Sequence, residues 1–115
     1  MTITMYIVVN RGLKMSKGKL GTQIVHGVIP MIERLSKDKN REYLLWKNSG
    51  EKVVIVGGSE HDMINLLERY EGGKEYFCYD VIDEGRTELK RNSMTLLVFN
   101  PSGCIPSEIR GLKLY

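Results

Sequence analysis

The sequence has 115 residues, of which 42% are hydrophobic and 27% charged, and its formal net charge is +3. This length and composition are typical of one globular domain with one core and exclude a wholly disordered chain. There is no run of 18 apolar residues, so no membrane span is expected. The first ten residues are typical of a strand rather than a signal peptide. Cys78 and Cys104 fit no metal spacing such as CxxC. Cys78 lies in an apolar stretch and is expected to be a buried thiol, and the protein is expected in the cytoplasm, where thiols stay reduced.

The first third of the chain predicts a strand, a basic loop and a helix. Residues 3–9 are β-rich and nearly all apolar, as in a buried strand. Four basic residues and no acid follow between positions 11 and 19. From about Lys19, apolar residues recur at helical spacing as far as residue 35. Pro30 lies inside this pattern, and we expect it to kink the helix.

The rest of the chain alternates between helical and strand patterns. Turn and capping signals divide it into a helix ending near Lys47 before Gly50, a strand at 52–57, a helix opened by Ser59 and Asp62 and closed by Gly72, a strand at 75–82, a polar loop at 83–93, a strand at 94–99 and a short last helix after Pro101. The order β-α-α-β-α-β-β-α predicts an α/β fold. We expect a single domain with a four-stranded mixed β-sheet and helices packed on both faces.

The stretch LKMSKGKLGTQIVHG, residues 13–27, has the composition of an anion site at the start of a helix. It does not fit a Walker A loop, because five residues rather than four lie between Gly12 and Gly18, and because Lys19 is followed by Leu20. A helix N-terminus with Lys17 and Lys19 suits phosphate without requiring a nucleotide. The alternative is a solvated basic loop with no ligand.

A second candidate segment is DEGRT, residues 83–87, which follows the third predicted strand. Ligand crevices in open α/β sheets lie at the carboxyl ends of strands. If the first and third strands run parallel, this loop and the basic loop meet at one edge, and Asp83 lies near Lys19. Lysine keeps a neighbouring carboxylate ionised, and such a carboxylate can accept a proton from water. The alternative is that Asp83 and Thr87 only cap a turn.

Other catalytic arrangements are poorly represented in the sequence. It has no G-x-S-x-G elbow, no H-x-x-x-H, no CxxC and no repeated D-x-D. His61 is expected at the surface, and His26 has the position of a half-buried helix residue. We therefore expect no metal and no cofactor, and hydrolysis, if it occurs, by a positioned water.

Several separated segments together resemble one family. LKMSKGKLGTQIVHG is similar to the pattern L-K-M-G-K-G-K-x-A-A-Q-x-x-H-A of the type 2 peptidyl-tRNA hydrolases, the archaeal and eukaryotic kind. DEGRTEL resembles their D-A-G-R-T-Q-I, and the strand MTLLVFNP with the terminal LKLY resembles their C-terminal part. The order and spacing of these segments cover essentially the whole chain.

The resemblance implies cleavage of the ester that joins a peptide to the 3′ end of tRNA. The substrate would be peptidyl-tRNA, bound through its acceptor stem and 3′ end. The resemblance assigns catalysis to Lys19, Asp83 and Thr87. It assigns substrate binding to a second set, in which the two loop lysines would hold phosphates: Lys14, Lys17, Gln23, His26, Gly85, Arg86 and Thr95. Individual roles, and the choice between monomer and homodimer, stay open.

The chain also departs from the family pattern. Gly12 stands where the family has aspartate, and Asn100 stands where it has glycine. Alanines of the family are replaced by Gly21, Thr22 and Gly27. Two additional acids, Glu84 and Glu88, flank the candidate site and weaken its attraction for RNA. These differences keep open an alternative, a weak or inactive relative that binds tRNA or protein with the same fold.

Overall fold

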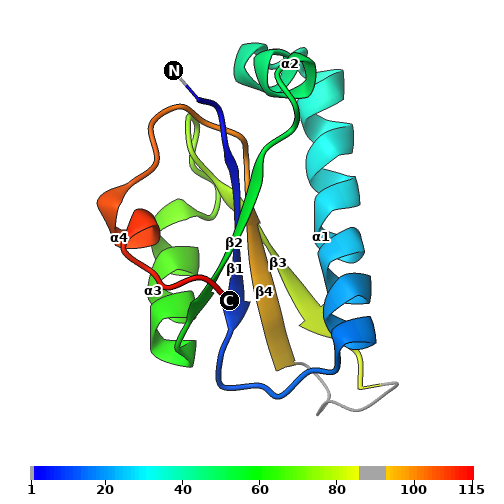
Figure 1. Cartoon of the computed structure of the whole chain (residues 1–115), viewed down its shortest axis with the longest axis vertical. Coiled ribbons are helices and arrows are strands. Elements are labelled where there is room, and N and C mark those ends of the chain that lie inside the picture. Colours follow the sequence, from blue (N-terminus) through cyan, green and yellow to red (C-terminus); the bar gives the residue numbers. More distant parts are fainter. Residues whose placement is uncertain (1, 86–92) are drawn as a thin grey trace.

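The computed structural model, which describes residues 2–85 and 93–115, contains a four-stranded sheet with the strand order β2-β1-β4-β3 (Figure 1). The central strand β1 (Met5–Asn10) pairs in parallel with β2 (Val53–Gly58). Its other neighbour is β4 (Ser93–Phe99), which is antiparallel to β1 and to β3 (Cys78–Asp83). Strands β1 and β3 therefore run in the same direction and end at the same edge, as a mixed sheet requires.

Helices cover both faces of this sheet. Helices α1 (Lys17–Lys37) and α2 (Arg41–Asn48) lie on one face, and α3 (Glu60–Tyr70) and α4 (Ser107–Arg110) lie on the other (Figure 1). The element order is the one expected from the sequence, and the predicted α/β fold is confirmed. Within the described ranges, no helix combines the length and the apolarity needed to cross a membrane.

Each face of the sheet has its own hydrophobic core, because apolar side chains alternate along the strands. The core under α1 and α2 is formed by twelve buried residues, among them Met5, Ile7, Val9, Met31, Leu35, Trp46, Leu96 and Val98. The core under α3 and α4 is formed by Val8, Val56, Met63, Leu66, Cys78, Leu97, Phe99 and Ile109. The buried state expected for Cys78 is thus confirmed. Burial of this apolar surface is the main stabilising contribution to the fold.

Helix α1 begins two residues earlier than the sequence pattern indicated. Its N-cap is Ser16, whose side-chain oxygen accepts a hydrogen bond from the backbone N–H of Lys19 at 3.1 Å. Pro30 does not interrupt the helix, which is continuous to Lys37. The capping box at the start of α3, between Ser59 and Asp62, is present as expected.

The ladder between β3 and β4 contains one irregularity, close to the edge where β3 ends. Val81 pairs with Leu96 and Ile82 pairs with Met94, so Thr95 is an extra residue on β4, as in a β-bulge. Leu96 packs in the core under α1, and the Thr95 side chain also faces α1, where it meets Gln23. The bulge therefore turns two consecutive side chains of β4 towards the same helix.

The start of β3 differs from the predicted strand at 75–82. The sheet ladder begins only at Cys78, because the preceding backbone is held by the side chain of Asn100. The Asn100 Oδ1 atom accepts from the N–H of Phe77 at 2.8 Å, and its Nδ2 atom donates to the carbonyl of Glu75 at 3.0 Å. Asn100, a departure from the family pattern, thus replaces strand pairing with side-chain hydrogen bonds.

Candidate active site

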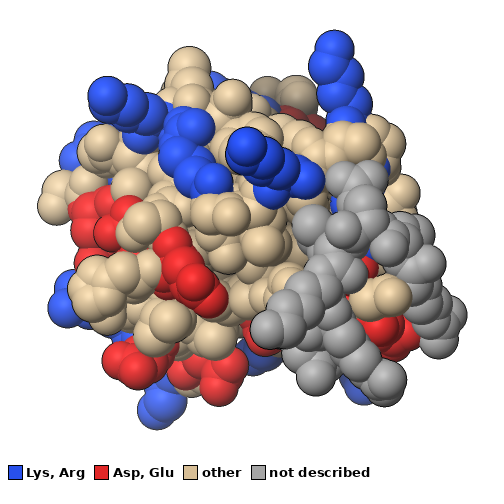
Figure 2. All heavy atoms as spheres, turned by 90° about the horizontal axis from the view of Figure 1, so that it is seen from below, with Lys and Arg blue, Asp and Glu red and all other residues tan. Residues whose placement is uncertain are grey.

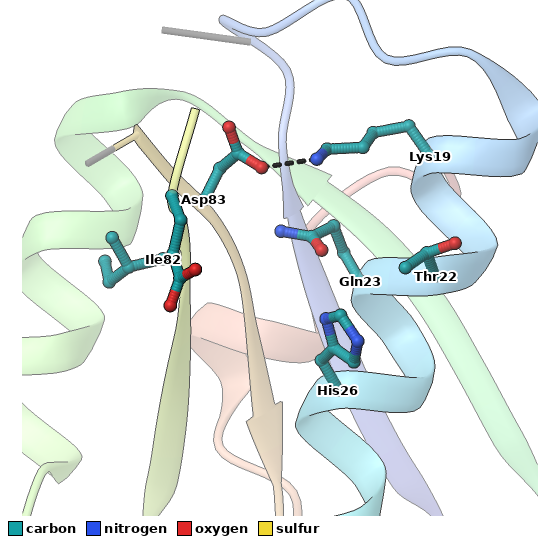
Figure 3. Close-up of a pocket in the computed structure, with 7 residues that line it drawn as sticks. Lys19, Thr22, Gln23, His26, Ile82 and Asp83 are labelled. Atoms are coloured by element: carbon teal, nitrogen blue, oxygen red, sulfur yellow. Dashed lines mark hydrogen bonds and ion pairs between the residues drawn. The ribbon is translucent and has the colours of Figure 1, made fainter. Parts of the chain in front are cut away.

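A cleft of about 420 Å³ opens between the first turns of α1 and the end of β3 (Figure 3). We call it the main cleft, and it is lined by Lys19, Thr22, Gln23, His26, Ile82, Asp83 and Glu84. The α1 residues of this set are at positions 19, 22, 23 and 26, which is the spacing of a single helix face. The cleft lies at the edge where β1 and β3 both end, which is where open α/β sheets hold ligands.

Lys19 and Asp83 form an ion pair in this cleft. The Nζ atom of Lys19 donates to Oδ1 of Asp83, and the two side chains point towards each other across the cleft (Figure 3). The pair is nearly removed from solvent, since the Lys19 side chain is 9% exposed and the Asp83 side chain 4%. The expected proximity of these two residues, 64 positions apart in the sequence, is present in the structure.

The electrostatics of the pair keep Asp83 ionised. The hydrogen bond from Lys19 is the largest cause of a lowered Asp83 pKa, and burial of the carboxyl group opposes it. A backbone hydrogen bond from Gly85 to Oδ2, 2.9 Å long, lowers the pKa further. Both carboxylate oxygens therefore accept hydrogen bonds, and Gly85 adopts a φ of +76°, which glycine tolerates best.

Gln23 is held one helical turn beyond Lys19 by a chain of hydrogen bonds. Its Nε2 atom donates to Oγ1 of Thr95 at 3.2 Å, and Oγ1 donates to the carbonyl oxygen of Val81 at 3.0 Å. Gln23 is 3% exposed and Thr95 is fully buried. Gln23 and Thr95, both assigned to substrate binding by the resemblance, are thus in contact, and Gln23 lines the cleft.

His26 is exposed rather than half-buried, which differs from the expectation for this helix position. The next residue, Gly27, is the one that faces the sheet and packs against it, so the His26 side chain points away from the core. His26 and Thr22 line the main cleft and also a shallower hollow along α1, which contains Gly18, Gly21 and Val25. His26 is therefore accessible from the cleft.

The basic loop residues lie beside the cleft rather than in it. Arg11, Lys14 and Lys17 are exposed, and none of the three lines the main cleft. Figure 2 views this end of the molecule and shows Lys and Arg side chains gathered in its upper part, with acidic side chains mainly in the lower left part. The cleft thus lies next to a surface that attracts anions.

The remaining expectations fall at the end of β3. Gly85 is close enough to donate to Asp83, but Arg86, Thr87 and Glu88 lie outside the described residues. The sequence analysis did not place Ile82 or Thr22 in the site, and it placed Glu84 beside the site without a role; all three line the cleft. Two of these flank Asp83 directly, and Thr22 lies three positions from Lys19 on the helix. Their spacing from the assigned residues is a signal that could have found them.

The side chains that could bind a metal ion do not cluster among the described residues. Over residues 2–85 and 93–115, no three His, Cys, Asp or Glu side chains group so as to hold a metal ion. Among the described residues that line the cleft, the charged groups are the ammonium of Lys19 and the carboxylates of Asp83 and Glu84. Such a set can orient polar groups of a substrate, hold a water by its protons and stabilise negative charge.

An α/β domain with a buried lysine–aspartate pair at the edge of its sheet defines the structural class, and comparisons with known proteins define the family. Residues 3–115 match the family model described as peptidyl-tRNA hydrolase PTH2. The peptidyl-tRNA hydrolase of Staphylothermus marinus is 34% identical over 96 residues, which are 83% of this chain and 78% of that protein.

Two further relatives agree with this match. The peptidyl-tRNA hydrolase of Methanothermobacter thermautotrophicus is 37% identical over 97 residues, 83% of this chain and 82% of that protein. A probable peptidyl-tRNA hydrolase 2 of Drosophila melanogaster is 31% identical over 99 residues, 85% of this chain and 53% of that protein. The chain belongs to the peptidyl-tRNA hydrolase PTH2 family, which is a family of enzymes.

Proposed function

We propose that the protein hydrolyses the ester bond between peptide and tRNA in peptidyl-tRNA, by attack of a water held in the main cleft and without a metal ion. The oxygen of the water forms a bond to the ester carbonyl carbon. The bond from this carbon to the 3′ oxygen of the tRNA breaks, that oxygen takes one proton of the water, and the other proton is released to the solvent. The products are a free peptide carboxylate and a tRNA with a 3′ hydroxyl. The observation that carries this proposal is the buried Lys19–Asp83 pair in the cleft.

Lys19 is assigned the stabilisation of negative charge. The ester carbonyl becomes an oxyanion when water attacks, and a cation in a nearly dry site stabilises that charge more strongly than it does in water. An ammonium group carries three N–H donors, which suffice for Asp83 and for an oxyanion together. Asp83 holds the ammonium at the cleft, because the carboxylate is itself fixed to the end of β3.

Asp83 is assigned the orientation of the water. Its lowered pKa keeps it ionised and makes it a weak base, so it holds the protons of the water by hydrogen bonds more readily than it removes one. Thr87 remains a proposed third participant. Lys14 and Lys17 are proposed to hold acceptor-stem phosphates, because they are exposed beside the cleft and phosphate contacts do not depend on base sequence.

The test is a single-sample assay of tRNA binding and ester cleavage. Purified protein, treated with a chelator, is mixed with tRNA that carries an N-acetylated aminoacyl group. We expect release of the acetylated amino acid. Lys19→Met and Asp83→Asn should each reduce kcat/KM by about 100-fold or more, because each removes a charge next to the reacting atoms.

Matched controls lie on the same elements. Lys37→Met removes a lysine from the far end of α1, and Asp80→Asn removes an exposed carboxylate from β3; both should keep the wild-type rate. Full activity of Lys19→Met and Asp83→Asn would contradict the proposed site. Binding of tRNA without any cleavage by the wild-type protein would instead favour the non-catalytic alternative.

A further inference from the structure

The orientation of the Gln23 side-chain amide can be deduced from its hydrogen bonds. A backbone carbonyl can only accept, so the hydroxyl of Thr95 must donate its proton to the carbonyl of Val81, 3.0 Å away. The Thr95 oxygen is then an acceptor towards Gln23, at 3.2 Å, and the atom that faces it must be the NH2 nitrogen. The Gln23 carbonyl oxygen is therefore the end of the amide turned away from the strands, as Figure 3 shows.

This orientation depends on the β-bulge. Thr95 is the additional residue of β4 opposite the Val81–Ile82 step, and only this extra position brings its hydroxyl to the α1 side together with Leu96. Bulges next to active sites commonly redirect a side chain in this way. Because Thr95 is fully buried and its hydroxyl is bonded on both sides, the NH2 end of Gln23 is fixed.

We propose that Thr95 holds the Gln23 amide with its carbonyl oxygen towards the main cleft, where this oxygen accepts a hydrogen bond from a hydroxyl group next to the scissile ester. The inference rests on the proposed function. Two O–H donors lie beside the ester in the reaction: the attacking water and the 2′-hydroxyl of the terminal ribose. In this scheme Gln23 contacts the substrate or the water, and Thr95 is a positioning residue that acts through Gln23.

A second acceptor has a clear use in this cleft. Each oxygen of Asp83 accepts one hydrogen bond, from Lys19 or from Gly85, and the proposed function gives Asp83 the water to hold as well. The Gln23 oxygen lies on the same helix face as Lys19 and carries no charge. It can therefore accept a hydrogen bond from an O–H group without drawing Lys19 away from Asp83. A buried acceptor without its donor is unfavourable, so the site discriminates against a 2′-hydrogen substrate where the donor is the ribose hydroxyl, and treats both substrates alike where the donor is the water.

The experiment combines protein variants with two substrates. The variants are Thr95→Val, which keeps the side-chain shape but removes the hydroxyl, Thr95→Ser, which keeps the hydroxyl, Gln23→Met, and the double variant Thr95→Val with Gln23→Met. Each is assayed for kcat/KM on N-acetylated aminoacyl-tRNA whose terminal ribose carries either a 2′-hydroxyl or a 2′-hydrogen. Far-UV circular dichroism and urea unfolding check that each variant is folded.

We expect Thr95→Val and Gln23→Met each to lower kcat/KM about tenfold on the 2′-hydroxyl substrate, the size of one lost hydrogen bond. Thr95→Ser should recover most of the wild-type value. The double variant should be no worse than Gln23→Met alone, because Thr95 acts through Gln23. Gln23→Met does not require the bulge hydroxyl, so it tests the proposal even if Thr95→Val fails to fold.

The two substrates identify the hydroxyl. If the effect of Gln23→Met disappears on the 2′-hydrogen substrate, the donor is the ribose hydroxyl; if the effect persists, the donor is the water, and both results support the proposal. Wild-type kcat/KM for Gln23→Met, or additive losses in the double variant, would overturn it. A wild-type protein that cleaves neither substrate would instead overturn the proposed function.

Discussion

Asp83 keeps its charge at the end of β3 because of the side chain that faces it. Removal from water favours the neutral carboxyl form, and the hydrogen bond from Lys19 reverses this preference. Since the pKa of Asp83 is lower in the folded than in the unfolded chain, the ionised form stabilises the fold above the unfolded pKa. That contribution is lost as the pH falls through the lower, folded pKa.

Replacing Lys19 by methionine should therefore move the Asp83 titration to higher pH. In the wild-type protein, the side-chain carboxyl carbon of Asp83 should titrate below the ordinary aspartate value of about 3.9. In Lys19→Met the burial of the carboxyl group remains and its main opposing cause is gone. An NMR pH titration of the carboxyl carbon in both proteins measures the shift, and activity is not needed for it.

Lys37→Met, which removes a lysine from the far end of α1, is the matched control for this titration. It should leave the Asp83 titration at its wild-type position, because Lys19 is the lysine that contacts Asp83. Equal Asp83 midpoints in the wild-type and Lys19→Met proteins would contradict the assigned cause of the shift.

Residue-scale expectations from the sequence succeeded where chain direction alone brings groups together. The approach of Lys19 to Asp83 follows from two parallel strands that end at one edge, and both residues could be chosen from the sequence. The partnership of Gln23 with Thr95 could not be derived from spacing, because it depends on a bulge that the strand pattern of MTLLVF does not reveal. The exposure of His26 depends on how α1 is rotated against the sheet, which local periodicity only approximates.

At the scale of elements, two of the three glycines in α1, Gly21 and Gly27, have opposite surroundings. A Cβ atom at Gly27 would approach Val98 Cγ2 to 2.6 Å and Val81 Cγ2 to 2.8 Å. A Cβ atom at Gly21 would meet no atom within 4 Å. Gly27 therefore allows α1 to lie close against β3 and β4, whereas packing within the chain gives no reason for glycine at position 21.

Alanine at these two positions should change stability in opposite directions. Gly21→Ala should raise the free energy of unfolding by up to about 1 kcal/mol, the difference in helix propensity. Gly27→Ala gains the same propensity but overpacks the core, which typically costs about 1–3 kcal/mol, so we expect a net loss. Urea unfolding of both variants, followed by circular dichroism, measures the difference. A Gly27→Ala protein more stable than Gly21→Ala would show that the helix moves freely off the sheet.

The elements themselves could be predicted well because their signals are local. Apolar runs, capping residues and glycines mark, in the correct order, the eight elements that the described part of the chain contains, including the capping box at Ser59. The start of β3 differs from the expectation for a tertiary reason. Residues 75–77 have a strand-like composition, but Asn100 binds their backbone in place of a neighbouring strand. Pro30 fits within α1 without breaking it.

At the scale of the whole molecule, Arg11 joins three segments that are distant in sequence. Its Nη2 atom donates to the carbonyls of Leu114 and Lys113, at 2.7 and 3.2 Å, and its guanidinium lies 5.4 Å from the centre of the Tyr115 ring. Residues 113–115 in turn hydrogen-bond to the backbone of β2 through Gly57 and Ile55. The basic loop before α1 is thus tied to the outer edge of the sheet.

Removing this connection should weaken the fold without touching the main cleft. Arg11→Ala should lower the free energy of unfolding by about 1 kcal/mol, because its hydrogen bonds to carbonyls are lost at a solvent-exposed position. Arg41→Ala, which removes an exposed arginine from α2, is the matched control and should change stability little. Urea unfolding measures both, and equal stabilities for the two variants would contradict the role of Arg11 as an anchor.

The position of β4 also has a consequence for synthesis. It is the last of the four strands in the chain, yet it lies between β1 and β3 in the sheet. As the chain leaves the ribosome, β1 can pair with β2 once residue 58 has emerged, but β3 has no partner strand before β4 follows. A ribosome that stops before residue 93 holds a chain that already contains Lys19 and Asp83 but has no strand to bring them together. Assembly of the cleft thus waits until β4 has been translated and can pair with both β1 and β3.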